Sequence, residues 1–185
     1  MKRILIVVAV LMLLPSLTSR AQEYKYEAKL GWIPGDLLDL VYLMGEDPSG
    51  ETSYGPMKTV GIFTADFDYK VKNWVSVGTK LSYRNSWRDM RTVIDGDEVN
   101  GTDRIQAVSV MPTLKLTTGY DSIFRCYATL GLGLALDFSD GFNGGFVAPQ
   151  FTPIGISIGK KISWYCECGI GYAFTGFMTG LSWRF

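Results

Sequence analysis

Eight stretches of the chain alternate large apolar residues with small or polar ones, and this feature constrains the fold more than any other. A period of two is the period of a β-strand, because successive side chains point to opposite faces of the sheet. The sequence therefore predicts an all-β chain. The stretches cover residues 24–32, 59–70, 75–84, 104–117, 124–136, 154–159, 162–172 and 177–185.

The connections between these stretches are alternately short and long. Short turns are expected near residues 71–73, 118–122 and 160–161, and long polar connections at 33–56, 85–103 and 137–148. Strands joined in this order form an up-and-down antiparallel sheet, which removes its exposed edges by closing into a barrel. The sequence therefore predicts an eight-stranded antiparallel barrel in which the last strand pairs with the first.

Two local departures from this pattern are expected. Residues 36–44 in the first long connection read as a short helix, with Asp36 as its N-terminal cap. Pro112 interrupts the fourth strand, and proline removes a hydrogen bond from the ladder, so a bulge or kink is expected there.

The two faces of the strands differ in residue size, which bears on the environment of the barrel. The less apolar face is crowded with Gly, Ala, Ser and Thr, as the narrow lumen of eight strands requires. We therefore expect a transmembrane barrel with its apolar face toward lipid. Aromatic residues near the strand ends would then form girdles at the headgroups. These residues are Tyr24, Trp32, Tyr69, Tyr83, Trp164, Tyr172 and Trp183.

The less apolar face also carries charges of both signs. Charges inside a narrow lumen must be paired, because isolated buried ions are costly. We therefore predict a lumen plugged by an ion-pair network, with no open pore. The expected members are Lys25, Glu27, Lys29, Asp66, Asp68, Lys80, Lys115, Arg125, Glu167 and Arg184.

The first residues of the chain have the three parts of a signal peptide. Lys2 and Arg3 precede an apolar run at residues 4–14, which is too short to span a bilayer, and Ser19-x-Ala21 offers a cleavage site before Gln22. We expect residues 1–21 to be removed and residues 22–185 to form one exported barrel domain. That domain is mildly acidic, which argues against a nucleic-acid partner.

The last stretch carries a second sorting pattern. Gly180, Trp183 and Phe185 resemble the C-terminal signal by which the barrel-assembly machinery recognises outer-membrane barrels. With the eight alternating stretches, the whole mature chain resembles a small outer-membrane protein of the OmpA/OmpX barrel type. The resemblance implies a place in the cell envelope of a Gram-negative bacterium, in contact with outer-membrane lipid and lipopolysaccharide.

Catalytic chemistry finds little support in the residues. The chain contains no His. Outer-membrane barrel enzymes resemble one another in using a histidine as acid or base. Asp66 and Asp68 are more simply members of the ion network, and residues 95–98 lack the spacing of a calcium loop. We predict no enzyme, no cofactor and no metal site. A disulfide between Cys126 and Cys166 is not expected, because a strand separates them, and the role of Cys126, Cys166 and Cys168 stays open.

Three functions remain open at this point. The first is a porin-like but non-enzymatic structural or surface-interaction role through long extracellular loops. The second is passage or binding of small hydrophobic molecules, as in OmpW-like barrels, through a mouth helix that carries Leu37, Leu38, Leu40, Val41 and Met44. The third is a soluble, secreted, lipocalin-like ligand binder.

Overall fold

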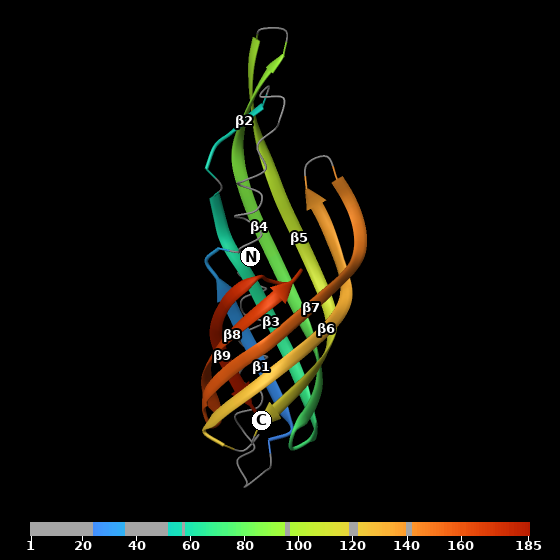
Figure 1. The fold of residues 1–185 in the computed structure, drawn as a ribbon, viewed down its shortest axis with the longest axis vertical. Coiled ribbons are helices and arrows are strands. Elements are labelled where there is room, and N and C mark those ends of the chain that lie inside the picture. Colours follow the sequence, from blue (N-terminus) through green and yellow to red (C-terminus); the bar gives the residue numbers. More distant parts are fainter. Residues whose placement is uncertain (1–23, 36–51, 57, 95–96, 119–121, 140–141) are drawn as a thin grey trace, which may run out of the picture.

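A computed structural model describes residues 24–35, 52–56, 58–94, 97–118, 122–139 and 142–185, and all of its regular elements are β-strands (Figure 1). The predicted signal peptide and the mouth-helix residues Leu37, Leu38, Leu40, Val41 and Met44 lie outside the described residues. The strands are β1 (Tyr26–Ile33), β2 (Thr52–Tyr54), β3 (Lys58–Lys72), β4 (Val75–Ile94), β5 (Asp97–Thr118), β6 (Phe124–Ser139), β7 (Phe142–Gly159), β8 (Ile162–Gly171) and β9 (Gly176–Arg184).

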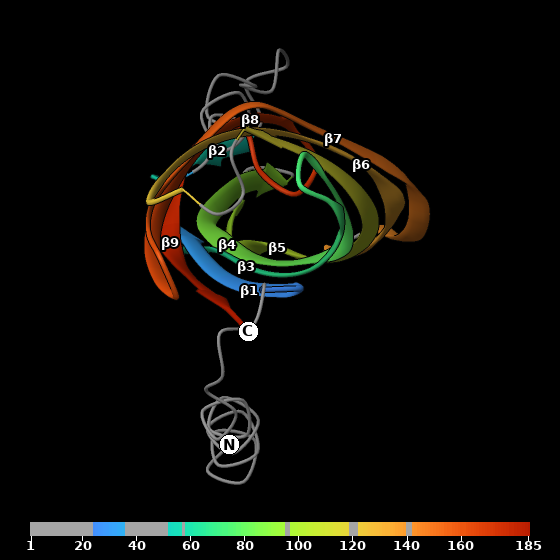
Figure 2. The same cartoon turned by 90° about the horizontal axis from the view of Figure 1, so that it is seen from below.

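Eight of these strands close into a barrel, which confirms the predicted architecture. From β3 to β9 each strand pairs antiparallel with the next one in the chain, and β1 pairs with both β3 and β9. The view along the axis shows the ring that results (Figure 2). The short strand β2 is not a member of the ring; it pairs with residues 90–92 of β4, just beyond the last pair of β3 with β4, Lys58↔Trp87.

The two faces of each barrel strand differ sharply in exposure. In β1 the side chains of Leu30 and Trp32 are exposed outside the barrel, whereas Glu27 and Lys29 are buried inside it. The same alternation runs through β8, where Trp164 points outward and Tyr165 inward. The apolar face is therefore the outer wall, and the small and charged residues fill the lumen.

Two of the predicted long connections are wrong. Residues 85–103 and 137–148 are largely paired strand, because β4 and β5 continue as a hairpin from Asn85↔Gln106 to Ile94↔Asp97, and β6 and β7 remain paired up to Ser139↔Phe142. Figure 1 shows both hairpins extending beyond the rest of the barrel at one end. Hydrogen bonds between the two strands can hold a hairpin together even where its residues are polar. Such a hairpin does not show the alternation of apolar and polar residues from which strands were predicted.

The expected irregularity at Pro112 is also not a bulge. Pro112 pairs with Thr79 in an unbroken β4–β5 register, and the β5–β6 register is the same on both sides of it. Register shifts occur elsewhere, between Tyr127 and Thr129 in β6 and between Phe151 and Ile154 in β7. Pro112 lies on the exposed outer face, and its missing N–H removes a donor without requiring an extra residue.

Within the described residues, no helix has the length and hydropathy that a membrane-spanning helix needs.

Candidate functional site: a charged and closed lumen

The register between β1 and β3 arranges the lumen in layers. Facing pairs along the two strands are Glu27 with Asp68, Lys29 with Asp66, Gly31 with Thr64, and Ile33 with Ile62. The lumen therefore changes from charged to apolar along its axis, with the charged part toward the end at which β1 begins.

In the first charged layer, two carboxylates share one lysine. The ammonium group of Lys115 binds both Glu27 and Asp68, which face each other across the two strands. Arg125 donates through Nη1 to Glu27 Oε1 at 3.0 Å, and through Nη2 to the hydroxyl groups of Ser157 and Ser163 at 2.6 and 3.0 Å. Two cations thus hold two carboxylates that would otherwise repel each other.

Glu167 is the centre of the second charged layer. Its carboxylate accepts hydrogen bonds from Lys29 at 2.7 Å, from Lys80 at 3.1 Å and from the hydroxyl group of Tyr127 at 2.9 Å. Lys80 Nζ also lies 3.2 Å from Asp66 Oδ2, and Lys29 Nζ lies 4.2 Å from the centre of the Tyr127 ring. Every charge in this layer has an opposite charge within hydrogen-bonding distance.

Together the two layers hold four carboxylates and four cations, so their formal charges cancel. All eight side chains are buried. Buried ions are tolerated when each is paired and hydrogen-bonded, and leaving one unpaired is strongly destabilising. The two layers therefore form one interdependent network that fills this part of the lumen.

An apolar plug closes the lumen above the charges. The short connection between β8 and β9 folds inward, where Phe174 is fully buried and its ring centre lies 5.1 Å from Lys80 Nζ. Figure 2 shows this connection, in red, inside the ring of strands. Ile62, Met111 and Met178 pack in the same apolar cluster. The lumen is thus closed twice, by ion pairs and by this plug.

Gln150 of β7 holds the plug in place. Its Oε1 accepts hydrogen bonds from the backbone N–H groups of Ala173 at 3.0 Å and Phe174 at 3.3 Å, and its Nε2 donates to the Phe174 carbonyl oxygen at 3.1 Å. A Cβ at Gly169 would lie 2.6 Å from the Phe174 ring, so this glycine leaves the space that the ring occupies. The sequence analysis missed the plug, although Ala173 and Phe174 form an apolar pair outside the alternating stretches.

The structure brings eight of the ten predicted network residues together, and the other two lie at the rim. The side chain of Lys25 is exposed, because this residue precedes the first paired residue of β1 and can reach water. This placement differs from the prediction. Arg184 is buried, and its Nη2 donates to the Gly159 carbonyl oxygen at 2.9 Å, while its guanidinium lies 5.2 Å from the Tyr24 ring.

The three residues of the predicted assembly signal lie along the seam between β9 and β1. Gly180 faces Gly31 of β1, and a Cβ there would lie 2.0 Å from the Leu30 carbonyl oxygen. On the outer face Phe185 stacks on Tyr26, with ring centres 5.7 Å apart, and meets Trp183 edge-on at 6.2 Å. Their contacts support closure of the barrel, and their recognition during assembly stays a prediction.

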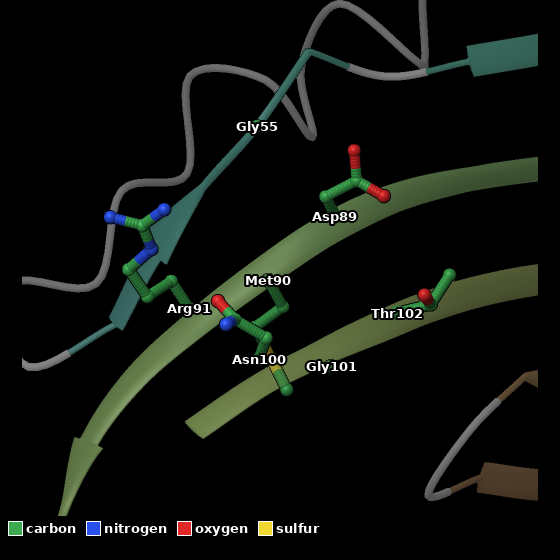
Figure 3. Close-up of a pocket in the computed structure, with 7 residues that line it drawn as sticks. All are labelled: Gly55, Asp89, Met90, Arg91, Asn100, Gly101 and Thr102. Carbon is green, nitrogen blue, oxygen red and sulfur yellow. The ribbon is translucent and has the colours of Figure 1, made fainter. Parts of the chain in front are cut away.

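The extended β4–β5 hairpin contains a second candidate site, a surface cavity of about 770 Å³ with a mixed polar and apolar lining (Figure 3). Asp89 and Arg91 project from β4, and they pair across the ladder with Thr102 and Asn100 of β5, so all four side chains line one face. Asp89 also forms an exposed ion pair with Lys58 at 2.8 Å. The sequence analysis missed this cavity because it assigned residues 85–103 to a loop.

The cysteines and acids of the described residues form no metal centre. Cys126, Cys166 and Cys168 are free thiols, and Ile156 of β7 separates Cys126 from Cys166. In the part of the chain that the structure describes, no three His, Cys, Asp or Glu residues lie close enough to hold a metal ion.

No protein-family model and no curated protein matches this chain.

Proposed function

We propose that this protein is an integral outer-membrane β-barrel with a closed lumen, which acts without catalysis as a structural and surface-interaction protein. The observation that carries the proposal is that apolar side chains face outward and charged side chains face inward, the reverse of a soluble protein. Outward-facing Leu132 and Phe177 are 61% and 72% exposed, whereas inward-facing Arg125 and Glu167 are 2% and 0% exposed. A monomeric soluble protein rarely exposes a large contiguous apolar surface, and lipid would cover this one.

The backbone is suited to lipid. A closed barrel satisfies its N–H and C=O groups between strands and leaves no open edge in the hydrocarbon region. Strands of about 9–11 residues cross a bilayer, and β8 and β9 have 10 and 9 residues. β4 and β5, with 20 and 22 residues, would then extend well beyond the bilayer.

The closed lumen argues against passage of solutes. Lys80, Arg125 and Glu167 lie inside it, and each is hydrogen-bonded. A conduit for small hydrophobic molecules would need a continuous apolar path, which the two charged layers interrupt. The same charges argue against a lipocalin-like binder, whose interior must be apolar to hold its ligand.

The extended hairpins supply the surface for interaction. The cavity on β4 and β5 presents Asp89, Arg91, Asn100 and Thr102, which can form hydrogen bonds with a partner, and Met90 adds an apolar contact. The partners we propose are membrane lipid and lipopolysaccharide around the wall, and the barrel-assembly machinery during insertion.

Reconstitution in lipid vesicles tests the proposal. The mature chain should resist carbonate extraction, migrate differently on a gel before and after boiling, and add no ion conductance to the bilayer. Release by carbonate together with identical mobility before and after boiling would contradict membrane insertion. A steady conductance from the inserted protein would contradict the closed lumen.

A further inference from the structure

An apolar crevice opens in the barrel wall near the end with the short turns. It has a volume of about 360 Å³. Its lining includes Trp74, Leu116, Cys126, Ala128 and Ile154, which come from four different segments of the wall. The crevice is distinct from the hairpin cavity, and it shares Tyr127 with the lumen network.

Two irregularities of the sheet account for the crevice. Between Tyr127↔Gly155 and Thr129↔Thr152, Ala128 of β6 alone lies opposite two residues of β7. Thr152 and Pro153 of β7 likewise lie opposite Gly169 alone in β8, so the extra residue belongs to β7 on both sides. Bulges bend a strand locally and increase its twist. Ala128 pairs with Leu116 of β5 and contributes only a methyl group. A bent wall with a small side chain at the bend leaves room that neighbouring side chains do not fill.

Lysine side chains of the described residues lie at this end of the barrel. The Nζ of Lys72 lies 6.0 Å from the centre of the ring of Trp74, which lines the crevice. Lys25, Lys160 and Lys161 lie at the same end of the barrel. Among the described residues, the carboxylates nearest this end in the strands, Glu27 and Asp68, point into the lumen and bind Lys115.

We infer that the crevice is a binding site for a glycerophospholipid with an anionic headgroup. One acyl chain would occupy the apolar crevice, and the headgroup phosphate would lie against Lys72 beside Trp74. The inference rests on the proposed membrane location and adds a specific lipid to it. An aromatic ring next to a lysine at a headgroup level suits this ligand, because the ring is amphipathic and the ammonium group attracts the anion.

The native cysteines provide the test. Cys126 lines the crevice, whereas Cys166 and Cys168 lie on the outer face of β8 with similar partial exposure and outside the crevice. Folded protein in maltoside micelles is labelled with N-ethylmaleimide in the presence of phosphatidylglycerol or phosphatidylcholine, and each cysteine is quantified by peptide mapping. Phosphatidylglycerol should protect Cys126 at about fivefold lower concentration, the ratio expected for one lysine near an anionic headgroup. Cys166 and Cys168 should not distinguish the two lipids.

Two matched pairs of variants complete the test. Lys72→Gln should abolish the preference for phosphatidylglycerol. Lys25→Gln, on the neighbouring strand end, where the Lys25 carbonyl oxygen accepts a hydrogen bond from the Lys70 N–H at 2.8 Å, should keep it, because Lys25 is not beside Trp74. Ala128→Phe should fill the crevice and remove the lipid-dependent protection of Cys126. Ala65→Phe, on the outer face of β3, should leave it unchanged.

Three results would overturn the inference. They are equal protection of Cys126 by both lipids, equal protection of all three cysteines, and lipid-independent protection with crosslinking between the Cys126 residues of two chains. The last result would assign the crevice to a second copy of the chain. A protein that inserts into vesicles but shows any of these results would still satisfy the proposed function. A protein that fails to insert would remove both.

Discussion

Replacing Lys115 by Met is expected to destabilise the folded barrel by about 3–5 kcal/mol, because it leaves a buried carboxylate without its cation. Lys115 binds both Glu27 and Asp68, and all three side chains are buried. Glu27 keeps its bond to Arg125 at 3.0 Å. Asp68 loses the cation that binds it in the lumen, and it still faces Glu27 across the β1–β3 ladder.

A second substitution separates the loss of a charge partner from the loss of packing. Asp68→Asn combined with Lys115→Met removes the uncompensated charge but keeps the altered packing. If the unpaired charge of Asp68 causes most of the loss, the free energy of unfolding of the double variant should exceed that of Lys115→Met by about 2 kcal/mol or more. This value lies within the range of coupling energies between residues in contact. Lys160→Met, at an exposed turn, serves as the surface control and should change stability by less than about 0.5 kcal/mol.

The assay is equilibrium unfolding by urea in lipid vesicles at neutral pH, with the gel mobility of unboiled protein as the measure of the folded fraction. All variants are compared with the parent chain in the same lipid. A loss below about 1 kcal/mol for Lys115→Met would refute the reasoning, because breaking a buried ion pair costs more than that. An equal loss in the double variant would assign the effect to packing.

Three further substitutions test the plug and the seam. Phe174→Ala should destabilise the barrel by about 3–5 kcal/mol in the same urea titration, since the ring is fully buried; no change would mean that the plug does not pack as described. Gly180→Ala should cost about 2 kcal/mol or more, because its Cβ would lie 2.0 Å from the Leu30 carbonyl oxygen. Gly101→Ala in the hairpin is its control, with only the end of a flexible Met side chain within 3.2 Å; equal losses would contradict the account of the seam. Trp183→Asp should lower the amount of barrel in the membrane fraction far more than a charge change in the hairpin at residues 85–103, and equal amounts would remove this residue from the assembly signal.

The interior of the barrel follows from the sequence because a strand has only two faces. Once the outer face of β1 is set by Leu30 and Trp32, Glu27 and Lys29 must point inward. The partners that each charge meets could not be predicted in the same way. Lys29 and Glu167 are 138 residues apart, and their contact depends on the closure of β1 against β9 and on the stagger of the strands.

The features that the sequence did not reveal lie where periodicity ends. The β4–β5 hairpin is polar beyond Asn85, so alternation could not separate it from a loop. Phe174 lies in a connection, and its inward direction is set by hydrogen bonds to Gln150 rather than by a strand. Lys25 falls on the same side of the alternation as the inward-facing residues Glu27 and Lys29. It lies at the end of the ladder, however, where a long side chain reaches water.

The most direct test of the central claim is the accessibility of spin labels along β6 in lipid vesicles. The three native cysteines are replaced by Ala, and single labels are placed at outward-facing Leu132 and Leu134 and at inward-facing Thr129 and Ala135. A lipid-facing wall predicts that labels at Leu132 and Leu134 relax strongly with oxygen, which dissolves in lipid, and weakly with a water-soluble nickel complex. Labels at Thr129 and Ala135 should respond weakly to both. Strong relaxation of the Leu132 and Leu134 labels by the nickel complex would contradict the account.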